Sequence, residues 1–307
     1  MGFAVVAMEM LAIAVPVVMG FVAHKLGLMG QKVDTSLSEL VLHIALPCLL
    51  IGAVGTGGEL PSVSDTIGLL GYSTVAYVLA WVLAMLAPRI IGAKGNLRGA
   101  YGFMIMFGNV GFIGYPVLSA ILGPEAVVYA AIANIPNAIL IFSVGIIMVS
   151  GKAGNPRDML LSLVNPTFFA SLVMLALVLF GINNLGFIGQ GCAIVGELTT
   201  PAALLVSGST LAKYAPAEML SNWRAYVASA LRLVGVPLVV LAVLGPLMPT
   251  GMLRNVIIIG QAMPVASNGI LYCLSYGVDE KPMLQATFIT IVASVFTIPL
   301  VSVLTLM

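Results

Sequence analysis

Charged residues are scarce in this chain of 307 residues, which has 12 Lys and Arg and 11 Asp and Glu, or 7% of the total. A soluble domain carries roughly 25% charged residues, so a water-soluble globular protein is excluded. The hydrophobic fraction of 61% excludes disorder, and a net charge of +1 without a basic cluster argues against a nucleic-acid partner. The composition therefore predicts a polytopic membrane protein embedded in the lipid bilayer.

Cysteine and histidine are also scarce. Three cysteines lie in apolar runs without a CxxC pair, and the two histidines, His24 and His43, are nineteen residues apart. These spacings predict neither a metal site nor a bound cofactor. An intramembrane enzyme would need a Ser/His pair or two Asp at membrane depth, and neither histidine lies near a matching Ser–Asp constellation. We therefore predict that the chain is not an enzyme.

Long apolar runs dominate what is present. About 20 apolar residues cross the hydrocarbon core as a helix, and period-2 barrel strands are absent. The runs predict ten membrane-spanning helices at about 3–23, 36–56, 66–87, 101–122, 126–149, 163–182, 186–211, 225–246, 255–276 and 283–306.

Positive charges are distributed unequally between the two sides of the predicted membrane. The loops after odd-numbered spans carry ten basic residues, whereas the loops after even-numbered spans carry only Arg254. The ten are Lys25, Lys32, Arg89, Lys94, Arg98, Lys152, Arg157, Lys213, Arg224 and Lys281. Basic loops stay in the cytoplasm, so this asymmetry predicts that both termini lie outside it.

The chain also shows a weak internal repeat. Two halves of five spans, residues 1–154 and 155–307, must have opposite topology because five is odd. A shift of 154 residues aligns Pro47 with Pro201 and Gly123 with Gly277. Chance is the alternative, because Gly and Pro are common in apolar chains. Inverted repeats of this kind are typical of secondary transporters.

Two spans at corresponding positions contain helix-breaking residues. The fourth span has Gly108, Asn109, Gly111, Gly114 and Pro116 within nine residues. The ninth span has a similar run, which comprises Gly260, Gln261, Pro264, Ser267, Asn268 and Gly269. Each run predicts two half-helices joined by an unwound stretch, where freed carbonyls could bind a cation and half-helix N-termini favour an anion. The alternative is a pair of kinked packing helices.

Polar side chains at membrane depth are the candidate functional residues. For substrate binding we select Asn109, Gly111, Gly114, Asn134, Asn137, Ser267 and Asn268, and for ion or proton coupling Gln261 and Glu197. Thr199, Thr200, Thr287 and Thr290 are interpreted as interhelical hydrogen-bonding residues.

Ionisable residues within the spans are few. His43 is expected to bond Glu39, and Glu9 is a possible proton carrier or a polar partner. Arg232 could snorkel to the interface or serve as a counter-charge to an anion. No ionisable residue is expected where the broken spans meet.

Four segments resemble one known family. The stretch GNVGFIGYPVL resembles the Asn-x-Gly-Phe-x-Gly-x-Pro signature of the auxin efflux carrier family, and QAMPVASNGILYCLSYGVDE resembles its second crossover motif. LPCLLIGA and LTTPAALLVSGSTLA resemble its second and seventh spans. The family is similar in fold to the bile-acid sodium symporters. The resemblance thus implies a compact bacterial member in the inner membrane.

The resemblance also implies an architecture. Ten helices would form two inverted repeats, with broken helices 4 and 9 crossing at Pro116 and Pro264. Helices 3–5 and 8–10 would form a moving transport domain, and helices 1, 2, 6 and 7 a scaffold through which a homodimer could form.

The functional expectation follows from the half-helices and the resemblance together. We expect a secondary active transporter of a small organic anion, such as malonate, malate or an auxin-like acid, by alternating access around the crossover. The alternative is a sodium-coupled symporter of a larger amphipathic anion, and a channel lined by the same helices is a third possibility. The coupling ion, Na+ or H+, is left open, because residues 260–268 contain no Asp or Glu to help bind sodium.

Overall fold

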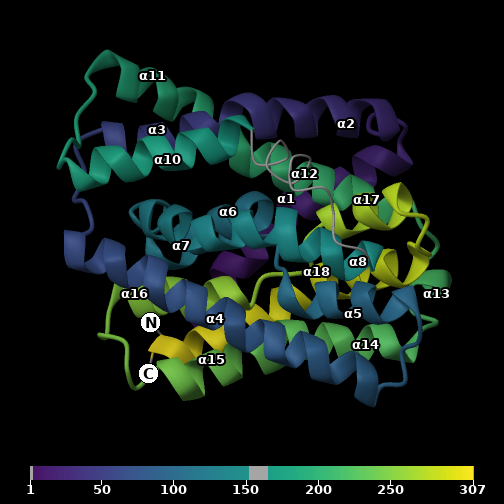
Figure 1. The fold of residues 1–307 in the computed structure, drawn as a ribbon. Coiled ribbons are helices and arrows are strands. Elements are labelled where there is room, and N and C mark those ends of the chain that lie inside the picture. The colour runs from purple at the N-terminus through teal and green to yellow at the C-terminus, as the bar shows by residue number, and fades with distance from the viewer. Residues whose placement is uncertain (1–2, 152–164, 307) are drawn as a thin grey trace.

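The computed structural model describes residues 3–151 and 165–306, and this part of the chain is helical without any strand (Figure 1). Lys152, Arg157 and the predicted boundary at residues 154 and 155 lie outside the described residues. The first half contains α1 (Phe3–Lys25), α2 (Gln31–Leu40), η1 (Val41–Ala45), α3 (Leu46–Gly55), α4 (Val63–Ile90), α5 (Asn96–Met106), η2 (Val110–Gly114), α6 (Tyr115–Leu122), α7 (Ala126–Leu140), η3 (Ile141–Gly145) and α8 (Ile146–Ser150).

The second half begins with α10 (Pro166–Leu179). The elements that follow are α11 (Phe187–Gly196), α12 (Thr199–Ala212), α13 (Pro216–Met219), α14 (Trp223–Ala230), η4 (Leu231–Gly235), α15 (Val236–Leu244), α16 (Met252–Gln261), α17 (Asn268–Ser275) and α18 (Lys281–Leu306). The η elements are single π-helical turns, which insert one residue per turn into helices that otherwise continue.

Seven helical segments in the described residues are long and apolar enough to cross a membrane. They run over Val5–Lys25, Gln31–Gly55, Val63–Ile90, Ala126–Ser150, Phe187–Ala212, Trp223–Leu244 and Lys281–Leu306. Val110–Leu122 and Pro166–Leu179 are shorter apolar helices. The predicted all-helical membrane protein is confirmed, whereas the count of ten crossings and the inverted repeat stay predictions.

Helix boundaries differ from the prediction in two places. The second span begins at Gln31 rather than 36, because Asp34 is buried against α12 instead of marking a solvated loop. The seventh span is divided into α11 and α12 by a turn at Glu197 and Leu198. The first difference arises from a tertiary contact, which apolar run length does not reveal.

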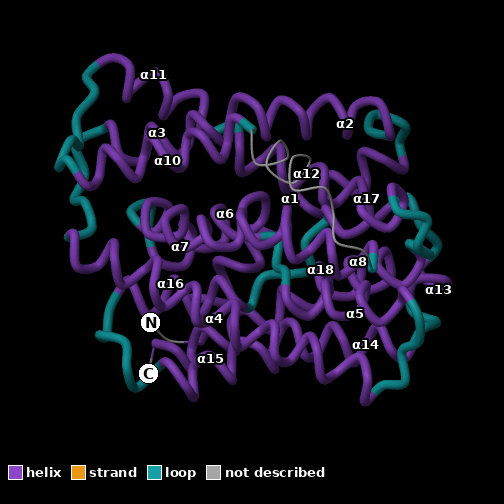
Figure 2. The backbone as a smooth tube through the Cα atoms, viewed as in Figure 1, coloured by secondary structure: helices purple, strands orange, loops and turns teal. Residues whose placement is uncertain are grey.

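Small residues let two pairs of helices, α1 with α12 and α3 with α11, approach each other closely. Helix α1 packs along α12, and a Cβ atom at Gly208 would lie 1.8 Å from the carbonyl oxygen of Val17. Helix α11 packs on α3 in the same way, because a Cβ at Gly52 would lie 2.7 Å from Ala193. Close backbone approach through small residues is the usual means of membrane helix packing. Helices α3, α10 and α11 lie together along one edge in Figures 1 and 2.

The two ends of the helical body differ in charge. Both termini and the loop from α15 to α16 lie at one end, and the loops that join α4 to α5 and α17 to α18 lie at the other (Figure 1). We call the second end the basic end, because its connections carry the basic residues counted above. Its described members are Lys25, Lys32, Arg89, Lys94, Arg98, Lys213, Arg224 and Lys281. That the basic end faces the cytoplasm stays a prediction.

Candidate functional site

Two helices are interrupted where their sequences contain Gly, Asn and Pro, and the interruptions pair with each other. The amide of Asn109 donates to the carbonyl of Pro264 at 2.7 Å, and the amide of Ala266 donates to that of Phe107 at 3.0 Å. Gly108 and Val265 thus form an isolated antiparallel bridge. Backbone groups freed inside a membrane need such partners. We call residues 107–109 and 262–267 the crossing.

Asn109 links the two halves of the crossing with both ends of its side chain. Its Oδ1 atom accepts a hydrogen bond from the amide of Phe112 at 3.3 Å, which caps the helix that begins at Val110. Its Nδ2 atom donates to Oγ of Ser267 at 3.3 Å. A capping Asn typically stabilises a helix by about 1 kcal/mol.

Two half-helix N-termini meet at the crossing and leave backbone donors unused. Among the described residues, the amides of Val110, Gly111, Ser267 and Asn268 have no hydrogen-bond partner. We call these four groups the amide cluster. The N-terminus of a helix carries roughly half a positive charge, so two of them together form a ready anion site.

Open space adjoins one side of the amide cluster. A Cβ atom at Gly111 would meet no atom within 4 Å, and the side chain of Ser267 is exposed. Gly114 differs, because a Cβ there would lie 3.2 Å from the side chain of Met263. Gly111 therefore keeps space in front of the amides, whereas Gly114 allows close packing behind them.

The two prolines differ in their positions relative to the interruptions. Pro264 lies in the crossing and its carbonyl takes part in the pairing. Pro116 lies inside the continuous helix Val110–Leu122, directly after the π turn η2, where its missing amide hydrogen leaves a carbonyl of the preceding turn without its helical donor. The expectation that Pro116 lies where the helices cross is therefore wrong, and the break falls at Phe107–Asn109 instead.

The predicted asparagines on α7 belong to a hydrogen-bond chain. Nδ2 of Asn137 donates to Oδ1 of Asn134 at 2.9 Å, and Nδ2 of Asn134 donates to the hydroxyl of Tyr115 at 3.1 Å. Asn137 is buried and its own Oδ1 has no partner among the described residues. The chain fixes the orientation of Asn134, which also lines a pocket.

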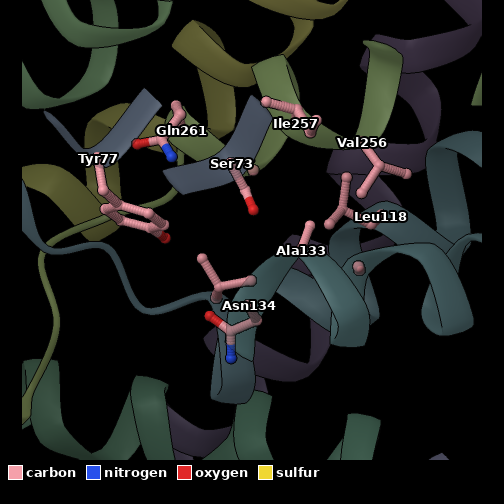
Figure 3. Close-up of a pocket in the computed structure, with 11 residues that line it drawn as sticks. Ser73, Tyr77, Leu118, Ala133, Asn134, Val256, Ile257 and Gln261 are labelled. Atoms are coloured by element: carbon pink, nitrogen blue, oxygen red, sulfur yellow. The ribbon is translucent and has the colours of Figure 1, made fainter. Parts of the chain in front are cut away.

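That pocket lies among α4, α6, α7 and α16 and encloses about 270 Å³, counting the part open to the surface. Figure 3 shows Ser73, Tyr77 and Gln261 on one side and Asn134 on the other. Gln261 is buried and its Oε1 atom has no partner among the described residues. Ser73 and Tyr77 are not among the predicted site residues, although their spacing of four places both on one face of a helix.

The remaining ionisable candidates are away from the pocket. Glu197 has an exposed side chain where α11 gives way to α12, and Glu9 is half-buried on α1. His43 bonds the backbone carbonyl of Glu39 at 2.9 Å rather than its carboxylate.

The expectation that no histidine lies near a matching serine and aspartate is wrong. His24 contacts Oγ of Ser209 at 2.9 Å, and the same hydroxyl donates to Asp34 at 2.8 Å. The order differs from a catalytic triad, where histidine stands between the other two and takes the proton of serine. Here Asp34 pairs instead with Lys213, at 2.8 Å, so the cluster joins α1, α2 and α12 structurally.

An ionisable residue does lie at the crossing, contrary to expectation. Arg232 on η4 has 0% exposure, so it does not snorkel. Its Nε atom donates to the carbonyl of Met263 at 3.0 Å, and Nη1 donates to those of Ile105 and Met106 at 3.3 and 2.9 Å. The π turn and the fold of three separate segments place it there, which no local pattern indicates.

Comparisons with known proteins agree with this architecture. The model of the family described as "Membrane transport protein" matches residues 5–302. The chain is 24% identical over 295 residues to an uncharacterized transporter of Methanothermobacter thermautotrophicus, with 95% of this chain and 96% of that relative covered. It is 21% identical over 296 residues to an uncharacterized transporter of Methanocaldococcus jannaschii, with coverages of 94% and 96%. The chain therefore belongs to this membrane transport family, that of the auxin efflux carriers which its crossing motifs resemble.

Proposed function

We propose that this membrane transporter is a secondary active carrier of a small organic anion, which binds at the crossing and is released by alternating access. The observation that carries the proposal is the amide cluster: two half-helix N-termini with four unpartnered amides beside open space. Such donors complement carboxylate oxygens without any charged side chain.

The chemistry of the surrounding residues favours a compact anion. Asn109 and Ser267 add an amide and a hydroxyl beside the cluster, and Asn134 lies in the adjoining pocket. Asn137 supplies a further amide group on α7, and Asn268 supplies one at the start of α17. A mono- or dicarboxylate such as malonate or malate, or an auxin-like acid, matches this set of hydrogen-bonding groups.

We further propose two inverted repeats and a division of the molecule into a scaffold and a moving transport domain. Residues 1–154 and 155–307 would form inverted repeats, and both halves follow one order, three helical spans, a broken helix and a further span. The scaffold would comprise α1, α2, α3, α10, α11 and α12, and a homodimer could form through it. The transport domain would comprise the other spans, with both termini outside the cytoplasm of a bacterial inner membrane.

The experiment is uptake of radiolabelled malonate into liposomes containing the purified protein. Asn109→Ala removes both the cap and the amide at the crossing, so we expect uptake to fall at least about tenfold. Asn183→Ala is the matched control, because Asn183 bonds the carbonyl of Gly58 far along the chain. Equal uptake by Asn109→Ala and the control would contradict the site. A screen of mono- and dicarboxylates by thermal shift then selects among the substrates.

A sodium-coupled symporter of a larger amphipathic anion is the second candidate. One observation favours it: the buried, unpartnered Oε1 atom of Gln261 could serve as a cation ligand. Glu197 would be an alternative carrier of a coupling proton. An imposed sodium gradient that accelerates uptake, with no effect of a pH gradient, would support this candidate over proton coupling.

A further inference from the structure

Arg232 is the largest side chain that is fully buried in the described residues. It reaches the crossing from a third helix and contacts both interrupted ones. Ile105 and Met106 are the last two residues of α5, and Met263 follows the end of α16. Three carbonyl oxygens therefore converge on one guanidinium.

Arg232 forms no ion pair with a carboxylate of the described residues. Within residues 3–151 and 165–306, the ion pair found is that of Lys213 with Asp34. An uncompensated buried charge is strongly unfavourable. Here two helix C-termini, those of α5 and α16, end at the guanidinium, and each carries about half a negative charge. Together they balance one positive charge.

The backbone leaves room for this side chain at one position. A Cβ atom at Gly108 would lie 2.2 Å from Nη2 of Arg232, so any other residue would collide with the guanidinium. Nη2 is itself buried and has no partner among the described residues. The crossing thus has two kinds of helix end: the carbonyl ends held by Arg232, and the N-termini of the amide cluster.

We propose that Arg232 is a tethered cation, which permanently occupies the carbonyl-lined place at the crossing where other transporters with broken helices bind an exchangeable metal ion. Unwound carbonyls and half-helix C-termini are the groups that coordinate Na+ in such folds. Because the carbonyl oxygens of Ile105, Met106 and Met263 already accept hydrogen bonds from the guanidinium, they are not free to coordinate a metal ion. The inference rests on the proposed function in assigning the amide cluster to the substrate.

Arg232 is accordingly a positioning residue. By holding α5 and the residues after α16 together, it fixes the positions of the two half-helices that begin at the crossing. The substrate site is then assembled without bound sodium, and transport is independent of sodium at the crossing. A lysine would not replace it, because the guanidinium reaches these carbonyls from two separate nitrogens, Nε and Nη1, whereas an ammonium has a single nitrogen.

The experiment compares wild type, Arg232→Ala and Arg224→Ala in sodium, guanidinium or choline chloride at equal ionic strength. Arg224 is the matched control, because it lies on the same helix and also bonds a carbonyl, that of Ile91, at the basic end. Thermal unfolding is measured without substrate. We expect guanidinium, at tens of millimolar, to raise the Tm of Arg232→Ala by several degrees over choline and to leave the other two proteins unchanged.

Uptake of radiolabelled malonate provides the second measurement. Wild-type uptake should agree within about twofold in sodium and choline, while Arg232→Ala should fall about tenfold in choline and recover at least in part with guanidinium. If Arg232→Ala does not melt cooperatively, its yield of monodisperse protein after purification with guanidinium or choline replaces the Tm.

Three results would overturn the inference: a sodium requirement of the wild type, an unaltered Tm or yield of Arg232→Ala in guanidinium, or full activity of this variant in choline. Because unfolding is measured without substrate, a lack of malonate uptake would contradict the proposed function while leaving the cation measurement decisive.

Discussion

Two buried charged residues, Asp34 at the basic end and Arg232 at the crossing, are stabilised in different ways. Asp34 is 4% exposed and is met by the ammonium of Lys213 and the hydroxyl of Ser209. Arg232 is 0% exposed and bonds backbone carbonyls, and one of its nitrogens has no partner in the part of the chain that the structure describes. The first is a closed contact between packed helices. The second keeps polar groups and donors buried inside the helical body, beside the interrupted helices.

The helix packing near the basic end should be the most sensitive to added volume. Gly208→Val would place its Cβ 1.8 Å from the carbonyl oxygen of Val17, so α1 and α12 would have to separate. We expect a loss of about 3 kcal/mol or more in unfolding free energy, measured in detergent by thermal or denaturant unfolding. Gly191→Val is the control, because a Cβ at Gly191 meets nothing within 4 Å. Equal stability of the two variants would show that the close approach is not rigid.

The ion pair itself should contribute the next largest effect. Asp34→Asn removes the partner of Lys213 and leaves that ammonium beside a neutral amide, which should cost about 2 kcal/mol. Affinity for the anion should not change, since the pair joins α2 to α12 and not to the crossing. Glu39→Gln, an exposed change on the same helix, serves as control. A changed KM in Asp34→Asn would contradict the separation of the two regions.

At the crossing, volume should affect binding rather than stability. Gly111→Ala adds a methyl group to the open space in front of the amide cluster, where no atom lies within 4 Å. We expect KM for the anion to rise about tenfold with an unchanged Tm. Gly191→Ala should alter neither quantity. An unaffected KM would mean that the anion does not approach the amides at Gly111.

The smallest effect is expected in the hydrogen-bond chain on α7. Tyr115→Phe removes the hydroxyl that accepts from Asn134 and should lower stability by about 1 kcal/mol, with a few-fold loss of uptake. Tyr72→Phe is the control, because its hydroxyl bonds the carbonyl of Leu247 at the surface. If both variants transport alike, the orientation of Asn134 does not matter for the substrate.

The sequence predicts local features of this molecule well and convergent ones poorly. Apolar runs predict the helices, and the clusters around Asn109 and Pro264 predict the interruptions, since Gly, Asn and Pro act on their own turn of helix. The helix-breaking property of proline favours Pro116 as a crossing residue, yet Pro116 follows the π turn η2 inside a helix that continues from Val110 to Leu122.

What could not be predicted depends on contacts between distant segments. Arg232 bonds residues 31 and 127 positions away along the chain, and nothing in its own helix distinguishes it from a snorkelling arginine. The Ser209 hydroxyl joins His24 and Asp34 across even larger separations. Ser73 and Tyr77 were overlooked because one hydroxyl every four residues is common in membrane helices.

The short antiparallel pairing of Gly108 with Val265 has a consequence for motion. Two backbone hydrogen bonds, reinforced by the hydroxyl of Thr290 at the amide of Val265, tie the interrupted helices to each other. While they persist, α6 and α17 form one rigid body that must travel as a unit. Spin labels on these two helices should therefore keep a constant separation in every state of the cycle, while their distances to α3 and α11 change.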